Sequence, residues 1–177
     1  MATPSYTATP SGPAALRVLT PPLQDRQTLA RLRPAAIGAS ATLFAIAAIH
    51  AAWGAGRTWP YPDGPTLARN VLGLSDSPGV PPPAATMAVS GALAAAAAAA
   101  VARTSVNPRI RTAARLITLP AAAVLALRGV GGFAQSLLAP DAATEEFTRN
   151  DLRLYSPLCL ALAAGLAVLE KPTRAKS

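Results

Sequence analysis

Four long stretches of this sequence carry almost no charge, and they limit the folds that the chain can adopt. The stretches cover residues 34–56, 77–102, 116–140 and 154–169, and Arg128 is the one charged residue inside them. A helix needs about 20 predominantly apolar residues to cross a hydrocarbon layer roughly 30 Å thick. The fourth stretch is short for this, but flanking residues can extend it into the membrane interface. The pattern therefore predicts four transmembrane helices.

The alternative to a membrane protein is a soluble, alanine-rich helical bundle. A soluble helix of this length presents a charged or polar face to water. The stretch at 84–102 reads AATMAVSGALAAAAAAAVA, which is small or apolar on every side. Because no stretch shows a polar stripe at helical spacing, the sequence favours membrane insertion.

The distribution of basic residues predicts the orientation of the helices. Counted along the chain, the five segments outside the spans hold 4, 2, 4, 2 and 3 Lys or Arg residues. Alternate segments therefore sum to 11 (4 + 4 + 3) against 4 (2 + 2). The positive-inside rule then places the N-terminus, the middle loop and the C-terminus in the cytoplasm of a multi-pass cell-membrane protein. The net charge of +8 is explained by orientation, so we expect the lipid bilayer, and no nucleic acid, as the partner of the basic residues.

The expected fold class is an all-α membrane protein, with four transmembrane helices in an antiparallel bundle and a disordered cytoplasmic N-terminal tail. Residues 1–33 are predicted to form a disordered or interfacial tail, within which 22–33 fit a short interfacial helix and an unstructured basic anchor equally well. Residues 171–177 form a basic cytoplasmic tail. The helices of the transmembrane domain, residues 34–170, are expected at about 34–55, 84–103, 116–138 and 154–170.

The scarcity of histidine and cysteine excludes several kinds of site. The chain has one histidine, His50, and one cysteine, Cys159. Motifs that bind zinc or haem through several histidines are therefore absent, and no internal disulfide can form. The sequence predicts no metal site and no cofactor.

Arg128 is the most informative polar residue of the expected membrane domain. It follows Leu116 by 12 residues, which corresponds to roughly 18 Å along a helix, near the midplane. An arginine at that depth costs a few kcal/mol, so it is expected to face the bundle interior and to have partners. Gly132 and Gln135 continue the same helix face. A purely structural clamp that fixes helix register is an equally good interpretation.

Further polar residues are expected to gather with Arg128 in the outer half of the bundle. His50 and Trp53 share one side of the first helix, and Asp151 and Tyr155 share one side of the fourth at a spacing of four residues. Trp59 lies just beyond the first helix. Interface anchoring is the simpler interpretation of Trp53, Trp59 and Tyr155, and helix-to-helix hydrogen bonding is a common role of an intramembrane histidine. The candidate ligand-binding residues are His50, Trp53, Trp59, Arg128, Gly132, Gln135, Asp151 and Tyr155.

Four fragments, taken in order, resemble a family of proteins. They are His50-Ala51-Ala52-Trp53, Trp59-Pro60, the segment RGVGGF from Arg128 to Phe133, and the run from Phe147 to Cys159 that contains YSPLC. Together they resemble the bacterial family of small four-span membrane proteins called domain of unknown function 3995, over about residues 36–169. The chain departs from the expected pattern at Arg57, where the family would place a second glycine. The resemblance implies the four-helix fold and a polar outer face, and it implies no activity.

Three functions are compatible with these sequence features. The favoured one is a binding or accessory protein that holds a lipid or small amphipathic ligand in the outer half. The alternatives are a small membrane enzyme acting on an isoprenoid or lipid, and transport of protons or a small solute by an oligomer. The transport hypothesis would use a homodimer formed through small-residue helix faces, such as Ser90, Gly91 and Ala94. No recognisable catalytic motif supports the enzyme.

Overall fold

The uncharged stretches form helices that continue into the charged residues beyond them. The structure, a computed structural model, describes residues 23–74 and 81–170. Within these residues, four helical segments are long and apolar enough to cross a membrane. This result confirms the predicted all-α fold with four transmembrane helices. The spans are α2 (Leu23–Gly54), α4 (Pro83–Ala102), α5 (Pro108–Leu138) and the continuous segment formed by α6 (Glu145–Asn150), η2 (Asp151–Tyr155) and α7 (Ser156–Val168).

The helices extend beyond the uncharged stretches because charge marks the edge of a membrane and does not end a helix. α5 begins eight residues before Leu116, at Pro108, where the Asn107 side chain accepts a hydrogen bond from the Arg109 amide at 2.9 Å. Residues 23–33, for which a separate interfacial helix was one expectation, are the first turns of α2 and continue through Pro34. The predicted tails at 1–22 and 171–177 lie outside the described residues.

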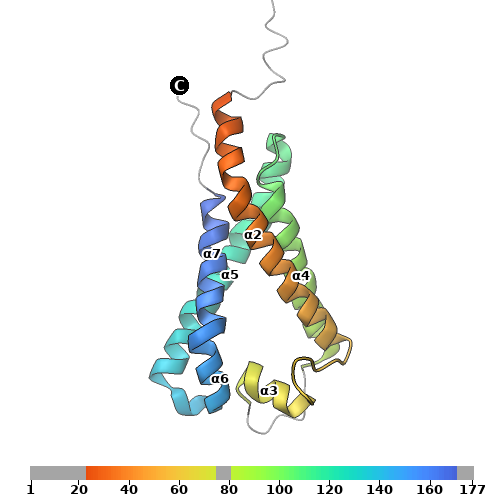
Figure 1. Cartoon of the computed structure of the whole chain (residues 1–177), viewed down its shortest axis with the longest axis vertical. Helices are drawn as coiled ribbons and strands as arrows, with labels where there is room; N and C mark the ends of the chain where they lie inside the picture. Colours follow the sequence, from red (N-terminus) through yellow and green to blue (C-terminus); the bar gives the residue numbers. More distant parts are fainter. Residues whose placement is uncertain (1–22, 75–80, 171–177) are drawn as a thin grey trace, which may run out of the picture.

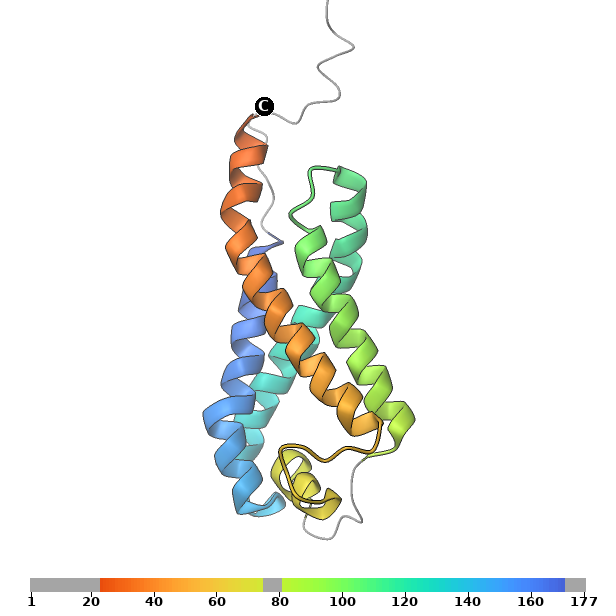
Figure 2. The same ribbon diagram turned by 45° about the vertical axis from the view of Figure 1, so that its right-hand side comes forward.

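The four spans form two pairs that diverge toward one end of the bundle (Figures 1 and 2). α2 packs along α4, and α5 packs along α7. The short helix α3 (Gly64–Leu72) lies at the end where the pairs diverge, which we call the α3 end. The opposite end, where α2 begins, α4 connects to α5 and α7 ends, is called the termini end.

Small residues allow the spans to approach one another in the buried core. The core lies on α2, α4 and α7, where Leu43 and Leu166 are fully buried against alanines such as Ala97 and Ala100. Membrane helices gain little from the hydrophobic effect between them, so close van der Waals contact of this kind holds them together. Across α2 and α4, the Ser90 hydroxyl also donates to the carbonyl of Ala47 at 2.8 Å.

Helix α3 is fixed at both of its ends and is joined to the other half of the bundle. Asp63 caps its N-terminus through a 2.7 Å hydrogen bond from the Thr66 amide, and Gly73 ends it in the left-handed region with φ of 72°. Glycine adopts that conformation without steric cost. The Thr144 hydroxyl donates to the carbonyl of Arg69 at 2.6 Å. Hydrogen bonds therefore tie α3 to the segment before α6.

Candidate functional site

An ion pair between α5 and η2 forms the centre of the polar residues at the α3 end. The Arg128 guanidinium donates to Asp151 Oδ1 at 2.6 Å. The Asp151 side chain is 0% exposed, whereas the Arg128 side chain remains 40% exposed. Arg128 lies ten residues before the end of α5 at Leu138, about 15 Å from that end. The pair is therefore within the span and in the half nearer to α3.

The second oxygen of Asp151 is also satisfied. Asp151 Oδ2 accepts hydrogen bonds from the hydroxyls of Ser156 at 2.8 Å and Ser136 at 3.1 Å. A buried carboxylate with an arginine and two hydroxyl donors has the partners that a low-dielectric environment requires. We refer to Arg128, Gly132, Ser136, Asp151 and Ser156 as the Arg128 site.

Gly132 makes room for this arrangement. A Cβ atom at position 132 would overlap the Arg128 guanidinium and the Ser156 hydroxyl, and it would lie 2.6 Å from Asp151 Oδ2. Gly129, one turn earlier, would meet Leu160 Cγ at 2.6 Å. The glycines of this segment thus allow α5 to approach η2 and α7 closely enough for the ion pair to form.

A π-helical turn sets which side chains face Arg128. In η2, the Ser156 amide donates to the carbonyl of Asp151, five residues earlier. The wider turn accompanies Pro157, which has no amide hydrogen to give to the preceding turn. As a result Asp151 meets Ser156, and the Tyr155 hydroxyl instead donates to the carbonyl of Asn70 on α3 at 3.2 Å. The regular spacing of four residues that would align Asp151 with Tyr155 does not hold here.

Arg128 retains hydrogen-bonding capacity that the described part of the protein does not use. A guanidinium has five N–H groups, and within residues 23–74 and 81–170 only the bond to Asp151 is formed by this side chain. Its Cζ atom also lies 5.9 Å from the centroid of the Phe147 ring, a cation–π distance.

His50 and Trp53 form a separate group on α2. Their ring centroids are 5.1 Å apart, and His50 Nδ1 lies 2.9 Å from the carbonyl oxygen of Ile46. The indole of Trp53 donates to the carbonyl of Trp59 at 2.8 Å. Both rings line a pocket between α2, α3 and α4. In the described residues, no hydrogen bond or ring contact joins this group to Arg128 or Asp151.

The side chains of the remaining candidates make no hydrogen bond with either group within the described residues. Trp59 follows α2 in the connection to α3 and is 69% exposed, and it is its carbonyl that accepts the hydrogen bond from Trp53. Gln135 is exposed on α5, and its side chain makes no hydrogen bond with the described residues. Ser90 faces α2 through its bond to Ala47, while a Cβ at Gly91 would meet open space. No group of three or more potential metal ligands occurs in the described ranges.

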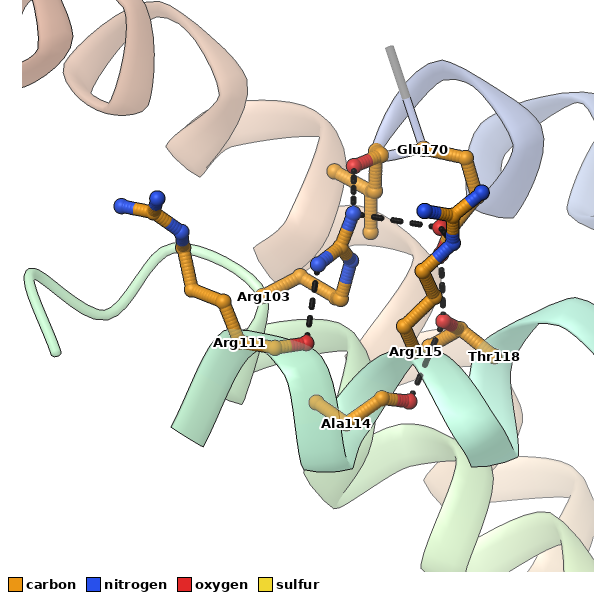
Figure 3. A network of polar contacts seen from close by, with 7 residues as sticks. Arg103, Arg111, Ala114, Arg115, Thr118 and Glu170 are labelled. Carbon is orange, nitrogen blue, oxygen red and sulfur yellow. Dashed lines mark hydrogen bonds and ion pairs between the residues drawn. The ribbon is translucent and has the colours of Figure 1, made fainter. Parts of the chain in front are cut away.

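A second buried polar network, absent from the predicted set, lies at the termini end (Figure 3). Glu170 accepts from Thr118 at 2.5 Å and pairs with Arg103 and Arg115, each at 3.1 Å. Arg103 also donates to the carbonyls of Arg111 at 2.8 Å and Leu169 at 2.9 Å. The sequence feature that indicates this network is Glu170. It is an acid at the end of the fourth apolar stretch, on the side of the membrane where arginines accumulate.

Comparison with known proteins places most of the chain in one family. The model of the family described as "Protein of unknown function (DUF3995)" matches residues 43–166 of the 177-residue chain, which confirms the resemblance found in the sequence. The matched range contains the whole Arg128 site and both rings of the α2 group. Neither the curated proteins nor the solved structures provide a match.

Proposed function

The chain belongs to the DUF3995 family of proteins of unknown function, and we propose that it is a non-catalytic membrane protein that binds an anionic lipid headgroup at Arg128. The observation that carries the proposal is the exposure of Arg128. Its side chain is 40% exposed inside a span, although its partner Asp151 is fully buried. In a membrane, the exposed part of this side chain faces lipid or a polar ligand.

The N–H groups of Arg128 that make no hydrogen bond with the described residues require an acceptor. Polar groups left without hydrogen bonds in an apolar medium cost several kcal/mol each. A lipid phosphate supplies oxygens in the geometry that a guanidinium edge recognises with two parallel hydrogen bonds. We therefore expect the phosphate to take the edge of the guanidinium that Asp151 leaves free.

Asp151 supports this role by holding the guanidinium in place. Its two oxygens accept from Arg128, Ser136 and Ser156, so the carboxylate cannot turn without breaking bonds to two helices. A fixed guanidinium loses less side-chain entropy when a ligand binds. Asp151 also neutralises Arg128, which favours its insertion into the membrane but weakens its attraction to anions.

Because Asp151 has opposing effects on lipid binding, the experiment substitutes it together with Arg128. Protein reconstituted with phosphatidylglycerol and phosphatidylcholine is transferred to detergent, and retained lipid is counted by native mass spectrometry. We expect wild type to retain phosphatidylglycerol and the double variant Arg128→Gln with Asp151→Asn to retain none. The double variant has the same net charge as wild type. Arg153→Gln, which removes an exposed arginine of η2, serves as the control and should behave as wild type.

One outcome would contradict the proposal. The double variant could retain as much phosphatidylglycerol as wild type while its helical content is preserved. That result would leave Arg128 as a clamp between α5 and η2. An enzyme that uses Asp151 as a proton donor receives less support from the geometry, because that carboxyl group is fully buried and bonded through both oxygens.

The orientation of the site in the membrane is part of the proposal. The segments that meet at the termini end carry the larger share of Lys and Arg, 11 against 4, so we place that end in the cytoplasm and the Arg128 site in the outer half. In a Cys159→Ser background, which has no other cysteine, Asp141→Cys should react with an impermeant maleimide on intact cells and Ser105→Cys should not. The reverse labelling pattern would overturn the orientation.

A further inference from the structure

A pocket of about 180 Å³ lies between α2, α3 and α4 and shares no lining residue with the Arg128 site. Its walls are formed by His50 and Trp53 of α2, Leu67 and Leu72 of α3, and Ala85 and Val89 of α4. Among the residues that the structure describes, no charged side chain contributes to the lining. We call it the His50 pocket. Its walls are largely apolar and include residues of α3. Such a lining is expected of a site that binds a hydrophobic group.

The polar side chains of the His50 pocket differ in whether they are already hydrogen-bonded. The Trp53 indole donates to the carbonyl of Trp59 at 2.8 Å, and the Thr86 hydroxyl donates to the carbonyl of Pro82 at 3.3 Å. Both of these donors are therefore occupied by the backbone of the protein itself. His50 is the remaining polar side chain of the lining.

The hydrogen bond made by His50 Nδ1 determines whether Nε2 can donate or accept a hydrogen bond. Nδ1 lies 2.9 Å from the Ile46 carbonyl oxygen, and a carbonyl oxygen only accepts, so the hydrogen of this bond belongs to Nδ1. In the neutral ring, Nε2 then carries a lone pair and no hydrogen. Within the described ranges Nε2 has no hydrogen-bond partner, and it is not among the fully buried polar atoms. His50, which lines the pocket, thus carries one unused acceptor.

We propose that the His50 pocket binds an uncharged hydrophobic alcohol, whose hydroxyl donates a hydrogen bond to His50 Nε2. The volume supports a group of limited size, because a cavity of about 150 Å³ accommodates benzene. A six-carbon ring bearing a hydroxymethyl group, or the hydroxyl end of a longer hydrocarbon, fits about 180 Å³. The described part of the lining supplies no counter-charge for a charged headgroup, which favours an uncharged ligand.

The two tryptophans of the chain provide a direct readout. Trp59→Phe leaves Trp53 as the single tryptophan, and it preserves the Trp59 carbonyl that accepts from Trp53. The heavy atom of 4-bromobenzyl alcohol quenches indole fluorescence at short range. Its methyl ether has a similar shape and bromine position but no hydroxyl to donate. We expect the alcohol to quench Trp53 saturably, at a concentration several-fold lower than the ether.

Three further variants in the Trp59→Phe background identify the groups responsible. His50→Phe keeps a ring and removes Nε2, so the difference between alcohol and ether should disappear. Thr86→Val is the matched control, since it removes a lining hydroxyl that is already bonded to the carbonyl of Pro82, and the difference should persist. Val89→Phe fills the pocket and should abolish saturable quenching by both compounds.

The proposal is overturned if the alcohol and the ether quench Trp53 equally, or if the preference for the alcohol survives in His50→Phe. Absence of saturable quenching in the parent protein would also overturn it. The result is independent of the lipid site, because the double variant Arg128→Gln with Asp151→Asn should bind the alcohol as the parent does. Circular dichroism of each variant establishes that the helices are intact.

Discussion

Arg128 of α5 and Asp151 of η2 approach to 2.6 Å at a point where only one of them is covered by protein. The carboxylate is fully enclosed, and the arginine side chain remains partly exposed. Removing Arg128 alone would leave a buried carboxylate without its counter-charge, which is destabilising. Paired neutral substitutions are for this reason the informative variants of the site.

Gly132→Ala should destabilise the protein because the added methyl group has no free space. Its Cβ would overlap the Arg128 guanidinium and Ser156 hydroxyl, and overpacking of this kind costs about 1–3 kcal/mol. Thermal unfolding in detergent, followed by circular dichroism, measures the effect. Gly131→Ala is the control, since a Cβ there would meet nothing within 4 Å. Equal melting temperatures for the two variants would show that the close approach at Gly132 is not required.

Insertion of an alanine after Leu154 should separate Asp151 from its partners. The insertion places Ser156 six positions after Asp151, where neither the five-residue π turn nor a regular α-helical turn aligns the two side chains. Ser156 would then no longer face Asp151. We expect lower thermal stability and loss of the retained phosphatidylglycerol. Leu154→Ala changes the exposed side chain beside the insertion without altering the register, and it should resemble wild type. If the insertion variant were as stable as wild type, the register of Ser156 against Asp151 would have no role in the site.

Arg103→Ala should be more damaging than Arg115→Ala, although both arginines pair with Glu170. Arg103 is 11% exposed and bonds two carbonyls as well as the carboxylate, whereas Arg115 is 55% exposed and bonds the carboxylate alone. We expect losses in the free energy of unfolding of about 3 kcal/mol for the buried arginine and less than about 1 kcal/mol for the exposed one. Denaturation in a mixed-micelle titration compares them. A reversed order would show that the network in Figure 3 does not hold the termini end together.

The N-cap of α3 should give the protein a local response to acid. Hydrogen bonds from Thr66 lower the pKa of Asp63 below its ordinary value of 3.8. Because the folded-state pKa is depressed, the stabilisation of α3 is complete above pH 4 and is lost as the pH falls through the folded-state pKa. The chemical shift of the Thr66 amide, followed by NMR, should titrate with a midpoint below 3.8. Asp63→Asn retains a capping oxygen and should remove the titration. A midpoint at or above the ordinary value would contradict the cap.

The sequence predicted the spans well and the polar contacts only in part, for physical reasons that differ by residue. Long uncharged runs have few stable alternatives to membrane helices. The helix ends were harder to predict, because residues such as Arg109 continue a helix into the interface. The depth of Arg128 indicated that it needs a partner. The role of Ser156 could not be inferred, since it depends on a π turn that no local pattern specifies. Glu170 was missed because its partners come from two other helices.

The span that ends at α7 is restrained at two levels of the membrane. Asp151 attaches it to α5 near one end, and Glu170 attaches it to α4 and α5 at the other. The two carboxylates are 19 positions apart, about 28 Å along the helix. Sliding or rotating this helix against α5 would break both attachments at once. Any rocking motion that opens the bundle near α3 must therefore be made by α2 and α4 moving together, with α5 and α7 acting as the stationary frame.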